Sequence, residues 1–265
     1  MVKLVVSDMD GTLLGPGSFL GQEALSIVEH LKQRGIGFTI ATGRSRSLSE
    51  GYEALLGLEL PYISCNGAMI LRRGQVIKRY SIPLCGLRAL IEEADRQEMS
   101  IVFSIDGEEF YLRETPWILE KRESEGFYQN RMDLSETVWE TLCLEKIMIM
   151  DGDASGRIGQ IEAKCRALPA QYGFTRYNDR SVEIVHREAT KANGIRFLSQ
   201  YLGIPMKEIL AIGDHQNDCE MLRAAGIGVA VANAIPAAQE NADYVTSGDH
   251  LAGVLEAVHT FCLKE

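Results

Sequence analysis

Both ends of the chain alternate short apolar runs with segments of helical periodicity, and this alternation limits the folds open to it. Near the N-terminus the apolar runs are residues 3–7 and 36–42. Helices are predicted after them, over about 24–31 and from 43 to about 56. Strands buried on both faces give continuous apolar runs of this kind. The order strand, helix, strand, helix predicts βαβ units and a parallel sheet covered on both faces.

The alternation breaks off in the middle of the chain and returns near the C-terminus. A third strand is predicted over 62–65, followed by a hairpin with strands at 68–71 and 76–80. From Lys191 the helix–strand alternation resumes. Its predicted elements are helices over about 191–202, 218–225 and 251–263, and strands over 209–212, 227–231 and 243–246.

Residues 82–186 have a different character. Amphipathic helices alternate there with short strands that have no parallel-sheet pattern, which predicts an α+β segment with an antiparallel sheet. The helices are expected over about 84–97, 117–125, 135–142 and 155–168, and the strands over 101–105, 109–112, 146–150 and 181–185. We therefore predict an α/β core made of residues 1–81 and 187–265, with residues 82–186 inserted as a second domain.

Two carboxylates follow the first apolar run, in Asp8-Met9-Asp10-Gly11-Thr12. Ligands of open parallel sheets bind at the carboxyl ends of the strands. Asp8 placed there can attack phosphorus and form an acyl phosphate. Asp10 can act as general acid toward the leaving oxygen and then as general base toward water. Gly11 permits a sharp turn and the Thr12 hydroxyl can hold the loop. The alternative is an acidic turn without chemistry, but its position after a buried strand favours catalysis.

A second acidic motif, Gly213-Asp214-His215-Gln216-Asn217-Asp218, follows the strand predicted over 209–212. More carboxylates beside Asp8 would repel it unless a hard dication lay among them, and Mg²⁺ prefers oxygen ligands. We expect the side chains of Asp8 and Asp214 and the backbone carbonyl of Asp10 to hold Mg²⁺. Asp218 is expected to orient Asp214 or a metal-bound water, to cap the following helix, or to do both.

Three further residues are candidates for holding a phosphate group. Thr42 and Gly43 end the second apolar run and precede a helix, where a hydroxyl and backbone N–H groups form an anion site. Lys191 opens a later helix, and its ammonium would offset the repulsion between a phosphate and an attacking carboxylate. Thr42 could instead be a simple strand-end hydroxyl, and Lys191 an exposed lysine on a helix. Arg44 is expected either to touch substrate or to form an ion pair within the core.

In this order the four pieces resemble the haloacid dehalogenase superfamily of phosphatases, and in particular its Cof-type sugar-phosphate phosphatases. The run from Asp8 matches the first motif, Thr42-Gly43-Arg44 the second, Lys191 the third, and the run from Gly213 the fourth. Supporting features are Asn66-Gly67-Ala68 and the segment 240–245. The resemblance covers essentially the whole chain. It departs at Ala192, where the subfamily usually has glycine after the lysine.

The resemblance implies a Rossmann-like parallel-sheet core with an α/β cap, which selects the substrate, inserted between the second and third motifs. It implies a phosphoaspartate on Asp8, acid–base work by Asp10, and Mg²⁺ held by Asp8, Asp10 and Asp214. It also implies phosphate contacts from Thr42, Lys191 and Asn217. The reaction expected is Mg²⁺-dependent hydrolysis of phosphate monoesters of small metabolites, such as sugar phosphates.

Two other functions stay open. A phosphomutase or phosphotransferase on the same scaffold would pass the phosphoryl group to a sugar hydroxyl instead of water. A regulator that only binds a phosphorylated ligand would not need the second carboxylate, Asp10. The sequence carries no motif for a particular metabolite or oligomeric state.

Bulk composition narrows the partners and the compartment. The formal net charge is −10, whereas nucleic-acid-binding proteins carry basic surfaces, so nucleic acid is not expected as a partner. No run approaches the ~18 apolar residues that a membrane span needs, and the first residues do not read as a signal peptide. Six cysteines lack any C-x-x-C spacing, as expected of reduced thiols in a cytoplasmic protein.

Overall fold

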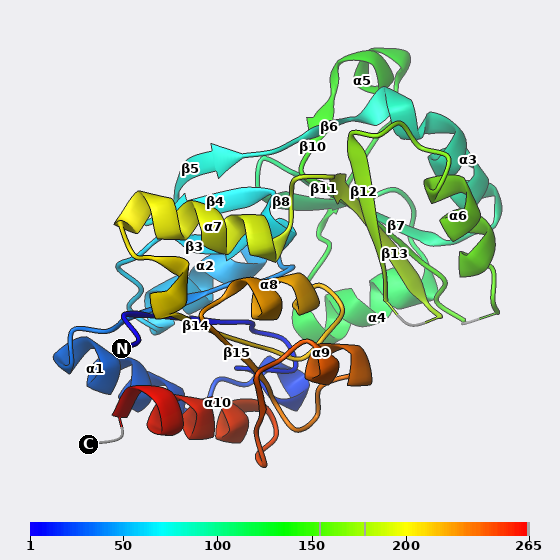
Figure 1. The fold of residues 1–265 in the computed structure, drawn as a ribbon. Helices are drawn as coiled ribbons and strands as arrows, with labels where there is room; N and C mark the ends of the chain where they lie inside the picture. Colours follow the sequence, from blue (N-terminus) through cyan, green and yellow to red (C-terminus); the bar gives the residue numbers. More distant parts are fainter. Residues whose placement is uncertain (154, 178, 264–265) are drawn as a thin grey trace. The chain divides into compact units, whose positions relative to one another are not determined.

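The computed structural model describes residues 1–153, 155–177 and 179–263 (Figure 1). The chain forms two compact units. Unit 1 comprises Met1–Arg44, Ser49–Ile77 and Thr190–Glu265, and unit 2 comprises Ser45–Leu48 and Lys78–Ala189. Within the described residues, no helix is long and apolar enough to cross a membrane.

A five-stranded parallel sheet forms the centre of unit 1. Its strand order is β16-β15-β14-β1-β2, with β1 at Leu4–Ser7, β2 at Gly37–Ile40, β14 at Ile209–Gly213, β15 at Ile227–Ala230 and β16 at Tyr244–Val245. In the register, Ser7 lies level with Ile40 on one side and Ile212 on the other. The residues that follow these three strands therefore meet at one edge of the sheet, as predicted.

Helices cover both faces of this sheet. In Figure 1, α7 (Lys191–Leu202) and α8 (Cys219–Ala224) lie on one face, while α1 (Gln22–Gln33) and α10 (His250–Val258) lie side by side on the other. Unit 1 also contains α2 (Arg46–Leu55), which begins in unit 2, and α9 (Pro236–Glu240). The helix predicted over 191–202 is confirmed. Thr190 caps its N-terminus by accepting a hydrogen bond from the Asn193 amide, and Gly203 ends it in the left-handed conformation.

The third predicted strand does not extend the parallel sheet. Strand β3 (Tyr62–Ser64) instead begins a separate sheet with β4 (Met69–Arg72) and β5 (Gln75–Arg79), and it runs antiparallel to β4. An isolated bridge between Ala41 and Ile63 links it to the end of β2. The hairpin predicted over 68–80 is confirmed.

Unit 2 contains a mixed sheet with the order β12-β13-β11-β7-β8-β9, antiparallel except between β8 and β9. Its strands are β7 at Ser100–Ile105, β8 at Glu108–Tyr111, β9 at Asn130–Arg131, β11 at Lys146–Met150, β12 at Tyr172–Tyr177 and β13 at Ser181–His186. A two-stranded ladder joins β6 (Ile82–Pro83) to β10 (Cys143–Leu144). The α+β character expected for this segment agrees with the structure, although β12 was not predicted.

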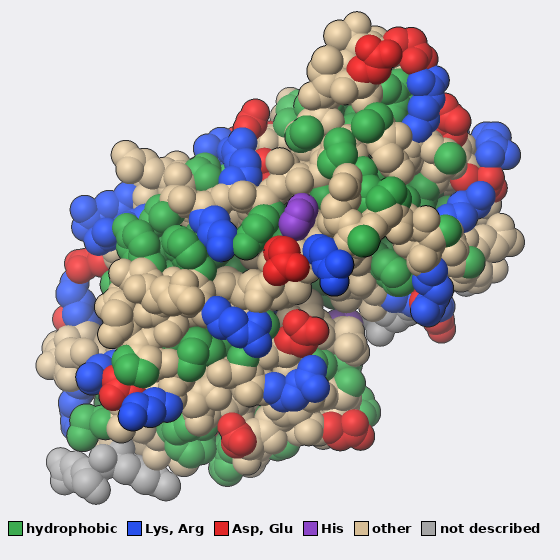
Figure 2. Space-filling model, turned by 45° about the horizontal axis from the view of Figure 1, so that its top comes forward, with side chains coloured by type: hydrophobic (Ala, Val, Ile, Leu, Met, Phe, Trp, Pro, Cys, Tyr) green, Lys and Arg blue, Asp and Glu red, His purple; other side chains and the backbone are tan. Residues whose placement is uncertain are grey.

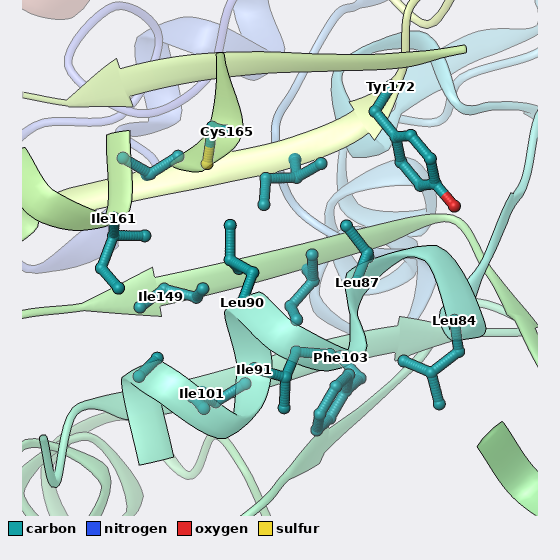
Figure 3. Close-up of a cluster of buried hydrophobic side chains, with 14 of the residues drawn as sticks. Leu84, Leu87, Leu90, Ile91, Ile101, Phe103, Ile149, Ile161, Cys165 and Tyr172 are labelled. Carbon is teal, nitrogen blue, oxygen red and sulfur yellow. The ribbon is translucent and has the colours of Figure 1, made fainter. Parts of the chain in front are cut away.

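The core of unit 2 lies on one face of this sheet. Ile101 and Phe103 point from β7 into a cluster shared with Ile149 of β11 and with helices α3 (Arg88–Arg96) and α6 (Ile158–Cys165) (Figure 3). Val102 faces the opposite side and packs in a smaller cluster with Ile118 of α4 (Pro116–Glu125). Alternate β7 residues thus point to opposite faces, as the two-residue period of a strand requires. Helix α5 (Glu136–Thr141) also belongs to this unit.

On the face drawn in Figure 2, acidic and basic side chains of the described residues are interspersed. The net charge of −10 is therefore not gathered on that face into one acidic surface.

Candidate active site

Asp8 and Asp214 lie next to each other where β1 and β14 end. The Asp8 amide donates to the Ile212 carbonyl at 2.9 Å, which continues the ladder between the two strands. Both side chains are buried. The Thr12 hydroxyl donates to Oδ1 of Asp214 at 2.7 Å and so ties the first motif to the fourth. Gly11 has φ +84°, and a Cβ atom there would lie 2.5 Å from Oδ2 of Asp214. Only glycine fits this approach without strain.

Lys191 and Asp218 complete a buried charge cluster. Carboxylate oxygens of Asp8, Asp214 and Asp218 lie within 4.8 Å of one another. The Lys191 ammonium donates to Oδ1 of Asp8 and, at 2.7 Å, to Oδ1 of Asp218. Lys191 is 1% exposed, so it is not the exposed helix lysine of the ordinary interpretation.

Asp218 uses its second oxygen to hold the turn before α8. Its Oδ2 accepts hydrogen bonds from the amides of Asp214 at 3.0 Å and His215 at 2.9 Å. Asp218 occupies the N-cap position of α8, but its side chain makes no capping bond to that helix. It therefore holds the Asp214 backbone and the Lys191 ammonium.

The electrostatics of this cluster favour an added cation. Burial raises the pKa of Asp8 well above its usual range; Lys191 opposes that rise, and Asp218 and Asp214 add to it. Burial also raises the pKa of Asp214, against the hydrogen bond from Thr12. Burial alone would lower the pKa of Lys191, but Asp218 and Asp8 outweigh it and raise that pKa. Negative charge is in excess and all the ligand atoms are oxygen, so the site fits a hard dication such as Mg²⁺.

Asp10 lies outside this cluster and is paired with Arg44. Within the described residues, the group of carboxylates that could hold an ion contains Asp218 rather than the Asp10 side chain. Arg44 Nε donates to Oδ2 of Asp10 at 2.8 Å and Nη2 donates to Oδ1 at 2.5 Å. The ion-pair interpretation of Arg44 is therefore the one that the structure shows. The expected metal contact of Asp10 is through its backbone carbonyl, and the pairing with Arg44 uses only the side-chain oxygens.

The predicted phosphate-binding residues Thr42, Gly43 and Asn217 converge on Asn66. Asn217 Nδ2 donates to Oδ1 of Asn66 at 2.8 Å, and the Asn66 amide donates to the Thr42 carbonyl at 2.9 Å. A Cβ atom on Gly43 would lie 3.3 Å from Asn66 Nδ2. Asn66 thus links the second motif to the fourth.

Sequence reasoning gave Asn66 no position of its own in the site. Its φ of 54° is left-handed, and the pair Asn66-Gly67 was the available signal of that turn. Asn233 was also missed. It donates to the Gly11 carbonyl at 2.8 Å and so holds the first motif, and no pattern around it marks that contact.

Comparison with known proteins decides the family. The sequence profile of the haloacid dehalogenase-like hydrolases matches residues 5–258. The chain belongs to this family. The Bacillus subtilis protein YxeH is 31% identical over the full length of both chains. HMP-PP phosphatase of Escherichia coli is 29% identical over 89% of this chain and 86% of its own.

Solved structures agree with the family assignment. BT1666 of Bacteroides thetaiotaomicron, described as a phosphatase of the haloalkanoate (HAD) superfamily, superposes with a TM-score of 0.81. The two sequences are 28% identical, and the match covers 100% of this chain and 96% of that one. The predicted fold class and the predicted enzyme class, a phosphatase of the haloacid dehalogenase type, are confirmed.

Proposed function

We propose that the protein hydrolyses phosphate monoesters of small metabolites through a phosphoaspartate on Asp8, with Mg²⁺ as cofactor. The observation that carries this proposal is the pairing of Asp8 with Lys191. A buried carboxylate at the end of the central strand β1 is oriented by a buried ammonium that also bonds Asp218. A nucleophile needs this kind of fixed orientation, and a phosphate needs a cation beside it.

The residues divide into groups by the step that each serves. Asp8 attacks phosphorus, and Asp10 gives a proton to the leaving alcohol and later takes one from water. Thr42, Gly43, Lys191 and Asn217 contact the phosphate. Asp8, Asp214 and the Asp10 carbonyl would hold Mg²⁺, which would offset the negative charge of carboxylates and phosphate. Thr12 and Asp218 keep Asp214 and Lys191 in place through the hydrogen bonds described above.

The substrate is a small phosphorylated metabolite. The name of the Escherichia coli relative refers to HMP-PP, and the Bacillus subtilis relative YitU is named as a 5-amino-6-(5-phospho-D-ribitylamino)uracil phosphatase. We assign the choice of metabolite to residues 82–186, the inserted domain predicted from the sequence. Unit 2, apart from Ser45–Leu48, is a continuous stretch between two parts of unit 1, which supports this division.

The test compares wild type with Asp8→Asn on p-nitrophenyl phosphate and on a panel of sugar, nucleotide and cofactor phosphates. Glu23→Gln, an exposed change on α1, is the matched control. We expect Mg²⁺-dependent release of inorganic phosphate that EDTA abolishes, an acid-stable mass increase on the peptide containing Asp8, and loss of both in Asp8→Asn. Undiminished turnover by Asp8→Asn would overturn the mechanism.

Two outcomes of the same panel would support the other functions. Isomerised sugar phosphate without release of inorganic phosphate would identify a mutase. Tight binding of a phosphorylated compound by wild type, without turnover of any member of the panel, would identify a regulator.

A further inference from the structure

Arg44 makes several hydrogen bonds in addition to its ion pair with Asp10. Its amide donates to Thr42 Oγ1 at 3.1 Å, and its carbonyl accepts from the Cys65 amide at 2.8 Å and from Ser64 Oγ at 2.7 Å. Its side chain is 10% exposed. The backbone from which the guanidinium extends is therefore fixed by the strands β2 and β3.

The guanidinium itself is fixed by the loop after the first motif. Nη2 donates to Ser18 Oγ at 2.7 Å, and the group lies 5.2 Å from the centre of the Tyr52 ring. The Tyr52 hydroxyl donates in turn to the Ser18 carbonyl at 2.9 Å. Ser18 has a left-handed φ of 57°, so this loop keeps an uncommon conformation where it meets Arg44. Arg44, Ser18 and Tyr52 form one connected group.

Asp10 is the more exposed partner of the pair. Its side chain is 52% exposed, so the carboxylate could rotate in solvent if nothing held it. Two parallel N–H···O bonds from the planar guanidinium fix both the position and the plane of the carboxylate. A carboxylate has about four lone-pair positions, so these two bonds leave acceptor positions for another donor.

We propose that Arg44 is a positioning residue that holds the Asp10 carboxylate in the orientation from which it takes a proton from the attacking water. This inference rests on the proposed function, since it assigns Asp10 to the second half of the reaction. In that step the water oxygen forms a bond to phosphorus and the bond from phosphorus to the Asp8 oxygen breaks. The water proton passes to Asp10, and Asp8 is regenerated as inorganic phosphate leaves. In this proposal Arg44 acts through Asp10, to which both of its fork N–H groups are bonded.

The first experiment follows p-nitrophenyl phosphate in the pre-steady state with full-length Arg44→Gln. Its leaving group departs without a proton, so formation of the phosphoenzyme depends little on Asp10. We expect a burst of p-nitrophenolate close to one equivalent per enzyme, followed by turnover ~10- to 100-fold slower than wild type. This is less than the contribution of about 10²- to 10⁴-fold from a general acid or base itself, because Asp10 is still present. KM should not increase. Arg44→Lys keeps the positive charge but not the two-pronged guanidinium, and its turnover should lie between those of wild type and Arg44→Gln. Arg34→Gln, a change at an exposed arginine of unit 1, is the control.

The second experiment asks whether Arg44 acts through Asp10. If it does, adding Arg44→Gln to an Asp10→Asn enzyme should cost no further rate, because interacting residues are not additive. A further loss equal to that in wild type would overturn the proposal, as would a rise in KM with unchanged kcat, which marks a substrate contact. An Arg44→Gln enzyme with wild-type turnover would overturn it as well. Thermal melts of each variant separate these results from unfolding.

Failure of the proposed function is visible in wild type alone. If wild type forms no phosphoenzyme, both proposals fall. If wild type forms one and the Arg44 variants show no burst, the role of Arg44 falls and the phosphatase mechanism stands.

Discussion

Lys191 Nζ donates a 2.7 Å hydrogen bond to Oδ1 of Asp218, and neither side chain is exposed to solvent. Replacing Lys191 with Met keeps most of the volume but leaves Asp218 and Asp8 without their shared ammonium. Removing one partner of a buried pair typically costs about 3–5 kcal/mol. We expect the free energy of unfolding to fall by that amount, measured by urea denaturation in EDTA.

The matched control is the double variant Lys191→Met with Asp218→Asn. The asparagine amide oxygen can still accept from the Asp214 and His215 amides, but it carries no charge to desolvate. We expect part of the lost stability to return. If the single variant unfolds at the same urea concentration as wild type, the ammonium does not stabilise this cluster.

Thr12 should control the affinity for Mg²⁺ without contacting the ion. Thr12→Val preserves the shape of the side chain but removes the 2.7 Å hydrogen bond to Asp214. Residues that orient metal ligands typically change affinity by about 10- to 100-fold. We expect a weakening of that size in a Mg²⁺ titration of activity or of binding heat. Thr12→Ser, which keeps the hydroxyl, should bind nearly as wild type does. Equal affinity in the Val and Ser variants would contradict the expectation.

Alanine substitutions at Gly67 and Gly74 should distinguish the cost of a left-handed backbone from the cost of a steric clash. Both have positive φ, +100° and +73°, but a Cβ atom on Gly67 would lie 2.4 Å from the Thr190 carbonyl oxygen, while one on Gly74 would meet open space. Gly74→Ala should cost only the left-handed conformation, about 1–2 kcal/mol. Gly67→Ala should cost roughly 1–3 kcal/mol more, because backbone must move.

The two glycine variants should also differ in activity. Thr190 caps α7 directly before Lys191, so displacing it shifts the ammonium beside Asp8. In phosphatase assays at a temperature where both variants are folded, kcat should fall in Gly67→Ala. It should equal the wild-type kcat in Gly74→Ala. Similar activities in the two variants would mean that Thr190 adjusts without moving Lys191.

The cysteines should differ in their reactivity with iodoacetamide. Cys85 and Cys143 are exposed, whereas Cys165 is buried in the core of unit 2, where burial raises the pKa of its thiol to about 12. The thiolate is the reactive form, so a raised pKa and low access both slow alkylation. Mass spectrometry near pH 8 should find Cys85 and Cys143 labelled first. Cys165 should be alkylated as fast as Cys85 and Cys143 only in denaturant. Equal alkylation rates in the native protein would show that the core of unit 2 opens readily.

Much of the fold could be predicted because local and global signals agree. The apolar runs before Asp8 and Asp214 favour buried strands of a parallel sheet, and the carboxyl ends of such strands lie at one edge of the sheet. Strand β12 was missed because Gly173 and Arg176 interrupt the apolar alternation among its aromatic residues, and the ladder with β13 holds it in place. Strand β3 has the composition of a parallel strand, but the Asn66-Gly67 turn returns the chain antiparallel to it as β4.

The motifs of the site could be predicted from the sequence, but the contacts between the motifs could not. Asp8, Lys191 and Asp214 follow from motif order and spacing. The bond between Asn66 and Asn217 joins residues 151 positions apart, and nothing local to either residue encodes it. For Arg44, sequence reasoning left substrate and ion pair open, because the choice depends on where the loop carrying Asp10 and Ser18 folds.

The pairing of β1 with β14 has a consequence for how the chain is made. On a ribosome, β1 emerges long before β14, so the edge of β1 that pairs with β14 stays open until Ile209 has been made. Closing so long a loop is slow compared with forming local hairpins or helices. During synthesis the nascent chain therefore carries an apolar strand with an open edge, the kind of segment that pairs with other chains. We therefore expect chaperone protection of β1 during synthesis to raise the yield of folded protein.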